Sequence, residues 1–496
     1  MTTPSLDPAL NFAPEKIASV HLMGIGGVAM GALAGALLRR GIIVRGADNP
    51  LYPPMSTFLA GLGIPVAAGY DPANLTPRPD LVIVGNVIRR DNPEALALAA
   101  AGIPYLSLPQ ALARFFISGK ASIVVAGTHG KTTTTALIAS GLMQAGRDPG
   151  FLVGGIMIEG GQNFRDGAGA HFVVEGDEYD TAFFDKRPKF VHYQPRIGLL
   201  TSLEFDHADI YADLNAVRRA FAMFMHALPA DGRLIAWGDS PEVLAQAASA
   251  PCPVQAYGRG EACAWRLLAA EPAGDGGARL TVRTPEGQTL EFTSPLAGEH
   301  NALNVVATVA ALVAAGLGAP EAAAVQAGFR GVRRRQEVRG AAGGVTVVDD
   351  FAHHPTAVRE TVNAVARFGL PGWRAGAGRL VAVFEPRSNT SRANHFQADY
   401  PPAFTGADLV FLREPPGMAA VPADQRLSSA RLAADIRAMG VPAQAHPDSD
   451  ALLTALLAEL RPGDLCLVMS NGGFDNLHAR LLEGLAGREG KRPGEK

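Results

Sequence analysis

The sequence predicts an α/β protein with three domains. Its 496 residues are about three times the length of a typical domain. Short apolar segments alternate with segments of helical period, which is typical of parallel sheets covered by helices. Twice, at residues 24–29 and 126–133, a glycine-rich loop stands between such a strand and such a helix. Loops of this kind hold phosphate groups, so at least two of the domains are predicted to be phosphate-binding units.

Three domains follow from the order of these segments, with boundaries at 1–117, 118–336 and 337–496. Strands are expected at 19–23, 42–45, 81–85, 122–126, 172–175, 197–202, 345–349, 380–384, 409–412 and 465–469. Helices are expected at 29–40, 133–144 and 302–315, and an antiparallel insert or edge at 261–292.

Composition excludes several classes of protein. With 48% apolar and 18% charged residues, the chain suits a buried core rather than disorder. A formal net charge of −3 gives no reason to expect a nucleic-acid partner. Cys252, Cys263 and Cys466 form no CxxC pair, which argues against a disulfide framework or a cysteine zinc site. We find no signal-peptide pattern and no apolar run long enough for a membrane span, so a cytoplasmic protein without a membrane partner is expected.

The strongest motif is the segment 126–133, Ala-Gly-Thr-His-Gly-Lys-Thr-Thr. Its glycines let backbone N–H groups point inward, and the helix that follows adds positive potential. Lys131 would reach the terminal phosphates of ATP, and the Thr132 hydroxyl would hold Mg²⁺. Val125 stands where GxxxxGK[ST] has its first glycine, so the loop is contracted. The predicted ATP-binding residues here are Gly127, Thr128, His129, Gly130, Lys131, Thr132 and Thr133.

Carboxylates follow the next apolar strand, in the segment 173–180, Val-Val-Glu-Gly-Asp-Glu-Tyr-Asp. A carboxylate at the carboxyl edge of a sheet can bind the metal of a nucleotide, and we predict Glu175 in this role. Asp177, Glu178 and Asp180 are expected to lie behind the ligand or in solvent. A plain acidic loop is the alternative.

A histidine flanked by acids follows another strand, in the segment 203–209, Leu-Glu-Phe-Asp-His-Ala-Asp. A neutral imidazole whose tautomer is fixed by a carboxylate is a good metal ligand. We therefore predict His207 as a ligand together with Thr132 and Glu175. A purely structural histidine is the alternative.

Three further segments carry polar side chains. In Gly298–Asn304, Asn301 could cap the following helix, or the amides of Asn301 and Asn304 could pair with a base edge; the motif by itself favours the cap. Arg335, at a domain junction, could close over a transferring phosphoryl group, with a solvated basic run as the alternative. Asp350, His353 and His354 follow an apolar strand, where ligands of open α/β sheets bind.

The N-terminal segment 24–29, Gly-Ile-Gly-Gly-Val-Ala, fits GxGxxA after a strand, and Asp48 follows the second strand. This fingerprint indicates that a diphosphate rests on the helix starting near Val28. It does not say whose diphosphate.

In this order, and across nearly the whole chain, these motifs resemble the Mur ligase family. The resemblance implies a Rossmann-like N-terminal domain for a UDP-sugar, a central P-loop ATPase domain and a Rossmann-like C-terminal domain for the incoming amine. Lys131, Glu175, His207 and Arg335 would carry catalysis, and Thr132, Glu175 and His207 would hold two Mg²⁺ ions. Asn301 and Asn304 would lie near the adenine, Arg335 near the phosphates and Asp350 near the ribose of ATP. Gly24, Ile25, Gly26, Gly27, Asp48 and Asn86 would face the UDP.

One departure from the family pattern indicates which branch of the family the chain resembles. Several Mur ligases carry a carbamylated lysine on the helix after the Asp-His motif, but residues 216–222 read Ala-Val-Arg-Arg-Ala-Phe-Ala. This is similar to the branch that acts directly on UDP-N-acetylmuramate and adds either L-alanine or a ready-made tripeptide. Segments 177–186, 385–390 and 469–475 resemble the tripeptide-adding members. Arginines there could pair with the carboxylates of a tripeptide ending in diaminopimelate; the predicted peptide-binding residues are His353, Arg387, Asn389 and Arg392.

The resemblance implies an ATP-dependent amide ligase of peptidoglycan recycling. ATP would phosphorylate UDP-N-acetylmuramate, and the amine of L-alanyl-γ-D-glutamyl-meso-diaminopimelate would attack the acyl phosphate. A UDP-N-acetylmuramate–L-alanine ligase is the alternative within the family. An NAD(P)-dependent oxidoreductase is the alternative of another class, suggested by GxGxxA and Asp48, but it leaves the P-loop unit unexplained.

Overall fold

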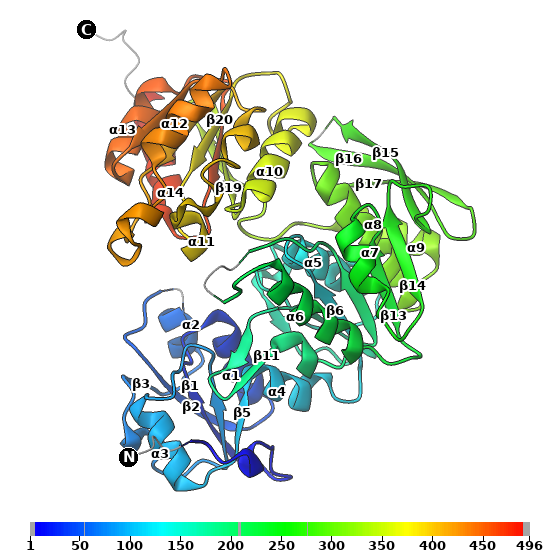
Figure 1. Cartoon of the computed structure of the whole chain (residues 1–496), viewed down its shortest axis with the longest axis vertical. Helices are drawn as coiled ribbons and strands as arrows, with labels where there is room; N and C mark the ends of the chain where they lie inside the picture. Colours follow the sequence, from blue (N-terminus) through cyan, green and yellow to red (C-terminus); the bar gives the residue numbers. More distant parts are fainter. Residues whose placement is uncertain (1–4, 54, 207–209, 275, 490–496) are drawn as a thin grey trace.

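The structure is a computed structural model that describes residues 5–53, 55–206, 210–274 and 276–489. Three α/β bodies follow one another along the molecule, from the N-terminal body at the bottom of Figure 1 to the C-terminal body at its top. Each body has a sheet of its own, so the predicted three-domain α/β architecture is confirmed. None of the helices within these ranges is long and apolar enough to cross a membrane.

The N-terminal sheet is wholly parallel, in the order β3-β2-β1-β4-β5. Its strand order reverses between β1 and β4, and ligands of such sheets bind at this switch point. Met23 and Val84 pair in register there, so the loops after them lie side by side. The elements are β1 (Ser19–Met23), α1 (Val28–Arg39), β2 (Ile43–Asp48), α2 (Met55–Gly61), β3 (Val66–Ala68), β4 (Leu81–Val84), α3 (Pro93–Ala101), β5 (Tyr105–Ser107) and α4 (Leu108–Leu112).

The central sheet has ten strands, in the order β17-β16-β15-β14-β13-β12-β6-β9-β7-β8. Strand β6 runs parallel between β12 and β9, so the P-loop, Glu175 and the segment after β12 emerge at one edge. The predicted antiparallel segment is the outer part of this sheet, β15 to β17. Its strands are β6 (Ala121–Ala126), β7 (Gly150–Leu152), β8 (Phe164–Arg165), β9 (His171–Gly176), β12 (Ile197–Leu200), β13 (Arg233–Trp237), β14 (Val254–Gly258), β15 (Trp265–Ala273), β16 (Gly277–Arg283) and β17 (Thr289–Ser294). A hairpin, β10 (Asp180–Ala182) and β11 (Asp185–Pro188), and helices α5 (Lys131–Gln144), α6 (Leu214–Ala227), α7 (Pro241–Ala247), α8 (Glu299–Ala314) and α9 (Ala319–Ala324) complete the domain.

The C-terminal sheet has the order β18-β19-β23-β20-β21-β22, with only β18 antiparallel. Met469 pairs with both Asp350 and Phe384, so three strand ends meet beside one another. The strands are β18 (Glu337–Ala342), β19 (Val345–Asp350), β20 (Leu380–Phe384), β21 (Leu409–Arg413), β22 (Ala443–His446) and β23 (Leu465–Met469). The helices are α10 (Pro355–Phe368), α11 (Asn389–Arg392), α12 (Ser429–Ala438), α13 (Ser449–Glu459) and α14 (Leu477–Glu489).

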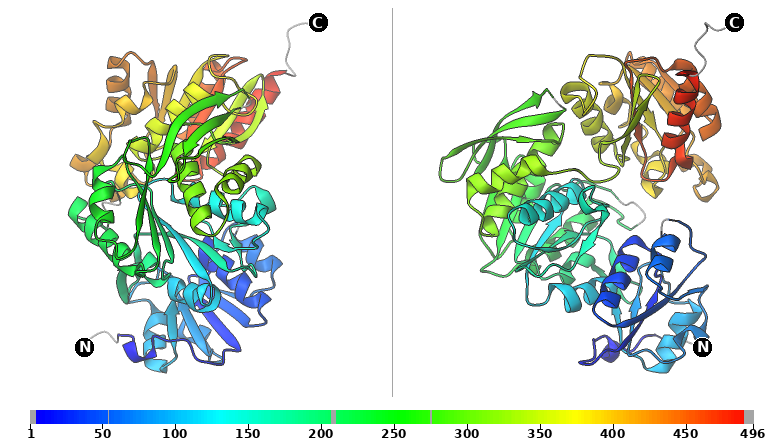
Figure 2. Two further views of the ribbon diagram at one scale, coloured as in Figure 1. Left: turned by 90° about the vertical axis from the view of Figure 1, so that its right-hand side faces the viewer. Right: turned by 180° about the vertical axis from the view of Figure 1, so that it is seen from behind.

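Strand β6 explains why the phosphate loop is rigidly placed. Ile123 and Val125 pack into the core that contains α5 and α8, whereas Val124 and Ala126 pack into the core on the opposite face of the sheet. Alternate side chains of a strand point to opposite faces, and both faces of β6 are covered (Figure 2). The first core continues into the C-terminal domain and the second into the N-terminal domain, so the central sheet is the frame of the molecule.

Candidate functional site

The P-loop turns sharply between β6 and α5. Gly127 has φ +134° and Gly130 has φ +81°, backbone conformations that side chains disfavour. A Cβ on Gly127 would lie 2.3 Å from Oγ1 of Thr201, and one on Gly130 would lie 2.7 Å from Oδ1 of Asn304. The glycines are therefore needed for both turn geometry and close packing. Helix α5 begins at Lys131, two residues before the predicted start.

Hydrogen bonds fasten this loop to the segment after β12. The N–H of Thr128 donates to the carbonyl of Ser202 (3.1 Å), and the N–H of His129 donates to Oγ of Ser202 (2.8 Å). The Thr128 hydroxyl accepts a 2.9 Å bond from the N–H of Glu204. These bonds preorganise the loop before any phosphate is bound.

Lys131 is held by an acid that the sequence did not single out for it. Its Nζ lies 3.0 Å from Oε2 of Glu178, which is 3% exposed. Burial lowers the pKa of Lys131, but the nearby carboxylates of Glu178, Asp177 and Glu175 together outweigh burial and raise the pKa above its usual value, so the ammonium stays charged. Glu178 is therefore not in solvent, one of its two expected positions; it follows β9 and lies behind the P-loop lysine. Asp177 and Asp180 pair instead with Lys189 and Lys186.

Glu175 and Thr132 form an oxygen-lined position beside Lys131. Oγ1 of Thr132 lies 3.3 Å from Oε2 of Glu175, and Oε1 accepts a bond from the N–H of Gly154. Burial raises the pKa of Glu175, as expected for a carboxylate that lacks a full counter-charge. A hydroxyl and a carboxylate suit Mg²⁺, which prefers oxygen ligands, so these residues fit the predicted metal. His207, the third predicted ligand, lies outside the described residues.

Arg335 reaches this group from the junction with the C-terminal domain. Its Nη2 donates to Oγ1 of Thr132 (3.2 Å), and its guanidinium lies 4.8 Å from the centre of the Phe351 ring. Burial lowers the pKa of Arg335. The alternative of a solvated basic run therefore fails for Arg335, whereas Arg333 is exposed.

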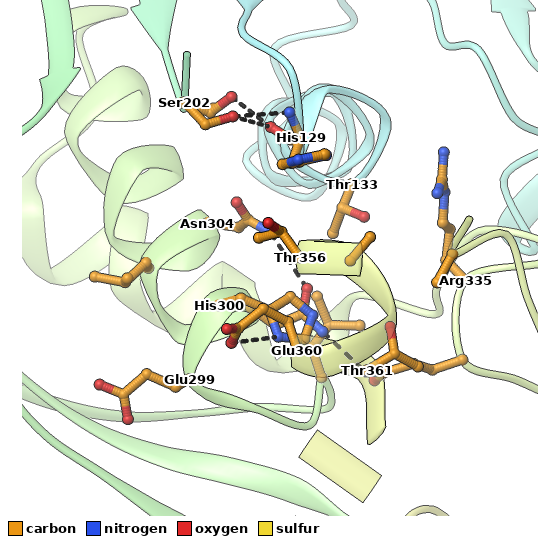
Figure 3. Close-up of a pocket in the computed structure, with 18 of the residues that line it drawn as sticks. His129, Thr133, Ser202, Glu299, His300, Asn304, Arg335, Thr356, Glu360 and Thr361 are labelled. Carbon is orange, nitrogen blue, oxygen red and sulfur yellow. Dashed lines mark hydrogen bonds and ion pairs between the residues drawn. The ribbon is translucent and has the colours of Figure 1, made fainter. Parts of the chain in front are cut away.

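A cavity of about 380 Å³ opens next to the P-loop, a size typical of small-molecule sites. Figure 3 shows His129 and Thr133 on its P-loop side, with Asn304 and Arg335 also around it. Seven of the eleven predicted ATP-binding residues line this cavity: His129, Gly130, Thr133, Asn301, Asn304, Arg335 and Asp350.

Asn301 does not cap α8. The helix begins at Glu299 with Gly298 as its N-cap, so Asn301 already lies inside the first turn. Its Nδ2 donates to the carbonyl of Ala297 (2.8 Å), and Oδ1 accepts a 3.3 Å bond from Asn304. The cap interpretation is wrong because the helix starts earlier than the apolar pattern suggests, and both amides line the cavity.

Asp350 closes the far side of the cavity. It is buried and accepts 2.8 Å bonds from the N–H groups of Gln336 and Ala352. Burial raises its pKa, and nearby Arg335 opposes this shift. Nearby, Arg334 donates to the carbonyls of Ser470 and Gly472, both at 2.6 Å. The domain junction is thus tied to the loop after β23.

The predicted UDP-facing residues meet at the N-terminal switch point. The N–H of Gly26 donates to Oδ2 of Asp48 (2.7 Å), whose Oδ1 accepts a bond from Tyr70 (3.1 Å). Ile25 is fully buried, so it can offer a ligand only its backbone. Gly24 and Gly27 flank these residues, with Gly27 as the N-cap of α1, and Asn86 is exposed after β4.

The predicted peptide-binding residues lie after β19 and β20. Nη1 of Arg387 lies 3.8 Å from Oε1 of Glu385, and nearly half of the Arg387 side chain is exposed. Arg392 donates to Oδ1 of Asn389 (2.6 Å), so two predicted residues bind each other. His353 is partly buried, and burial lowers its pKa.

A charged network behind Arg387 was missed by the sequence analysis. Arg413 pairs with the fully buried Glu385 and with Asp475 (2.8 Å), and Ser470 donates to Glu385 (2.7 Å). Glu385 and Arg413 end adjacent strands, and Ser470 follows β23. Only their shared position at strand ends could have pointed to them.

Three family models match the chain in succession. They are the Mur ligase family catalytic domain at residues 19–119, the Mur ligase middle domain at 125–312 and the Mur ligase glutamate ligase domain at 334–472. Over 474 residues the chain is 41% identical to the UDP-N-acetylmuramate–L-alanyl-γ-D-glutamyl-meso-2,6-diaminoheptandioate ligase of Escherichia coli, covering 94% of this chain and 98% of the relative. The chain belongs to the Mur ligase family.

Other Mur ligases extend this comparison. A UDP-N-acetylmuramate–L-alanine ligase of Kineococcus radiotolerans is 36% identical over 487 residues, covering 95% of this chain and 97% of that one. The crystal structure of a murein peptide ligase from Psychrobacter arcticus matches with a TM-score of 0.69 and 32% identity, covering 95% and 99% of the two chains. As a Mur ligase, the chain is an ATP-dependent ligase that forms carbon–nitrogen bonds. This assignment replaces the oxidoreductase interpretation of the N-terminal glycines.

Proposed function

We propose that this Mur ligase joins L-alanyl-γ-D-glutamyl-meso-diaminopimelate to UDP-N-acetylmuramate, in peptidoglycan recycling. The observation that carries the proposal is the 41% identity, over almost the full length of both chains, to a ligase named for this reaction. The alanine-adding relative is also similar over its full length, at 36%. The half-exposed Arg387 favours the tripeptide, because its ion pair with Glu385 is long at 3.8 Å and its guanidinium can pair with a substrate carboxylate.

The first step of the proposed reaction brings two anions together. The lactyl carboxylate of UDP-N-acetylmuramate attacks the γ-phosphorus of ATP, ADP leaves, and an acyl phosphate forms. Lys131 and Arg335 place positive charge beside the phosphates and reduce the repulsion. The hydrogen bonds that fasten the P-loop to the segment after β12 hold its backbone in place for ATP. Thr132 and Glu175 would hold Mg²⁺, which when bound supplies further charge neutralisation.

In the second step the tripeptide amine attacks the acyl carbon, and inorganic phosphate leaves. The amine must be neutral to attack, so its proton has to go to a base. Burial lowers the pKa values of His353 and His354, so both imidazoles are neutral at pH 7 and able to accept that proton. Both stand at the start of α10, on the C-terminal domain that would bring the peptide.

A product assay tests the proposal. The purified protein is incubated with ATP, Mg²⁺ and UDP-N-acetylmuramate, together with either L-alanine or the tripeptide, and the products are identified by mass. We expect only the tripeptide adduct. An alanine adduct alone would replace the proposal with a role in de novo cell-wall synthesis.

A further inference from the structure

Three side chains converge where the central and C-terminal domains meet. This cluster does not include Thr132 or Glu175. His129 belongs to the P-loop, Glu204 follows β12, and His354 precedes α10. Oε2 of Glu204 lies 3.3 Å from Nε2 of His129 and 3.7 Å from Nδ1 of His354. The two imidazole rings are 4.8 Å apart, centre to centre. One ligand atom from each residue lies within 4.8 Å of the other two.

The two separations at Glu204 match the ligand shell of a small transition-metal ion. Zinc binds imidazole nitrogen and carboxylate oxygen at about 2.1 Å with tetrahedral angles, which places its donor atoms about 3.4 Å apart. The 3.3 and 3.7 Å separations at Glu204 are close to that value. Three protein ligands would leave a fourth position for water.

The protonation of Glu204 and His354 also suits a metal. Burial raises the pKa of Glu204, but hydrogen bonds with His129 and Thr356 outweigh burial and bring the pKa to about 2, so Glu204 is an anion. Burial lowers the pKa of His354 to about 4, which leaves its ring neutral. Metal ligation needs these deprotonated forms.

The two ring nitrogens of His354 have different roles: Nδ1 is the atom that lies 3.7 Å from Glu204 and would exchange its hydrogen bond from Thr356 for the ion. Its Nδ1 accepts a 3.3 Å bond from the N–H of Thr356. Its Nε2 is buried and has no hydrogen-bond partner among the residues that the structure describes. A buried polar atom without a partner calls for an explanation, such as an ion or a water.

We propose that His129, Glu204 and His354 bind a divalent transition-metal cation such as Zn²⁺. Imidazole ligands favour Zn²⁺ and Co²⁺, whereas Mg²⁺ prefers oxygen, so this site and the Thr132–Glu175 site select different metals. The ion joins the P-loop to the first turn of α10, whose N-cap is His354. The site goes beyond the proposed ligase reaction and does not depend on which amine the enzyme adds; with His354 on the ion, His353 is the base that accepts the amine proton.

Zinc binding to the full-length protein, without affinity-tag histidines and without ATP, tests the site. A chromophoric zinc chelator competes with the protein, and we expect one Zn²⁺ per chain. His354→Asn should weaken zinc binding at least about tenfold, since asparagine can cap α10 but does not replace the imidazole ligand. His226→Asn, which changes an exposed histidine on α6, should bind zinc like the wild type.

Two further variants separate the possible outcomes. Glu175→Gln should keep the zinc, and Glu204→Gln should lose it, which covers the case in which circular dichroism shows His354→Asn to be unfolded. A wild type that binds no zinc would overturn the site and leave the cluster as a hydrogen-bonded domain contact. Zinc lost in Glu175→Gln but retained in the folded His354→Asn would place the ion at Thr132 and Glu175 and equally overturn it.

Discussion

At the scale of single residues, the predicted catalytic lysine is already paired within the protein. Lys131 is paired with the buried Glu178, so a γ-phosphate must take over a contact that exists before ATP binds. Arg387 is nearly half exposed and lies 3.8 Å from Glu385, so its guanidinium can reach a substrate. Lys131 is thus fixed by a contact within the protein before any ligand binds, whereas Arg387 is not.

Lys131→Ala should lower product formation at least about 100-fold, because it removes a positive charge that stabilises the negative charge of the transition state. It also leaves Glu178 buried without its cation, which should lower the free energy of unfolding by about 3 kcal/mol. The double variant Lys131→Ala/Glu178→Gln should regain stability in urea unfolding but not activity. Near-normal turnover in either folded variant would refute the role of Lys131.

Arg387→Ala should raise the tripeptide KM about tenfold or more, since a charged hydrogen bond contributes about 1.5–3 kcal/mol. The KM for ATP should not change. Arg374→Ala, which removes another exposed arginine of the same domain, serves as the control in the same steady-state assay. An unchanged tripeptide KM would remove Arg387 from the peptide site.

His300 should make stability depend on pH. Burial lowers its pKa to about 4, whereas the unfolded imidazole titrates near 6.5. The stabilisation that comes from keeping this imidazole neutral is therefore fully present above pH 6.5 and is lost as the pH falls toward 4. When the pH is lowered from 7 to 5, the free energy of unfolding of His300→Gln should fall by about 1–2 kcal/mol less than that of the wild type. Urea unfolding at both pH values measures the difference. His226→Gln is the control and should follow the wild type. Parallel curves for His300→Gln and wild type would contradict this.

At the scale of elements, the contracted P-loop works because β6, β9 and β12 end at one edge and because two glycines fit against β12 and α8. A glycine just after helix α5 can be compared with the two glycines of the P-loop. Gly146, just after its end, also has a positive φ of +69°, but no atom lies within 4 Å of a Cβ built there. Conformational strain and steric overlap can thus be measured separately.

Gly146→Ala should cost only about 1–2 kcal/mol of stability, from left-handed strain. Gly127→Ala adds an overlap 2.3 Å from Oγ1 of Thr201 and 2.8 Å from the backbone N of Ser202, so it should cost more and abolish ATP binding. Calorimetric titration with ATP and thermal unfolding measure both effects. Equal losses in the two variants would mean that the loop tolerates the overlap.

At the scale of the whole molecule, the central domain meets its neighbours through different kinds of contact. Arg40 and Asp166 join it to the N-terminal domain by two 2.8 Å bonds, but both side chains are more than a third exposed, so the pair contributes little. Arg335, which lines the cavity beside the P-loop, joins it to the C-terminal domain through contacts with Thr132 and Phe351. Arg335 therefore connects this cavity, the predicted ATP site, to the position of the C-terminal domain.

Arg335→Ala should lower kcat/KM for ATP at least about 100-fold and reduce the compaction that a non-hydrolysable ATP analogue induces, as measured by small-angle X-ray scattering. The neighbouring Arg333→Ala, on an exposed side chain, should behave like the wild type. Compaction retained in Arg335→Ala would show that the residue acts on chemistry alone.

The sequence by itself determined the three-domain architecture and the order of the motifs, because strand period, buried apolar runs and glycine-rich loops are local properties. It placed β1, β20 and β23 with the bounds that the structure has, and it selected seven residues that line one cavity. Only the tertiary structure decided that Glu178 holds Lys131, that Asn301 faces the cavity instead of capping α8, and that His129, Glu204 and His354 converge. These contacts join residues far apart in the chain, and their geometry depends on strand order and domain packing, which no local pattern contains.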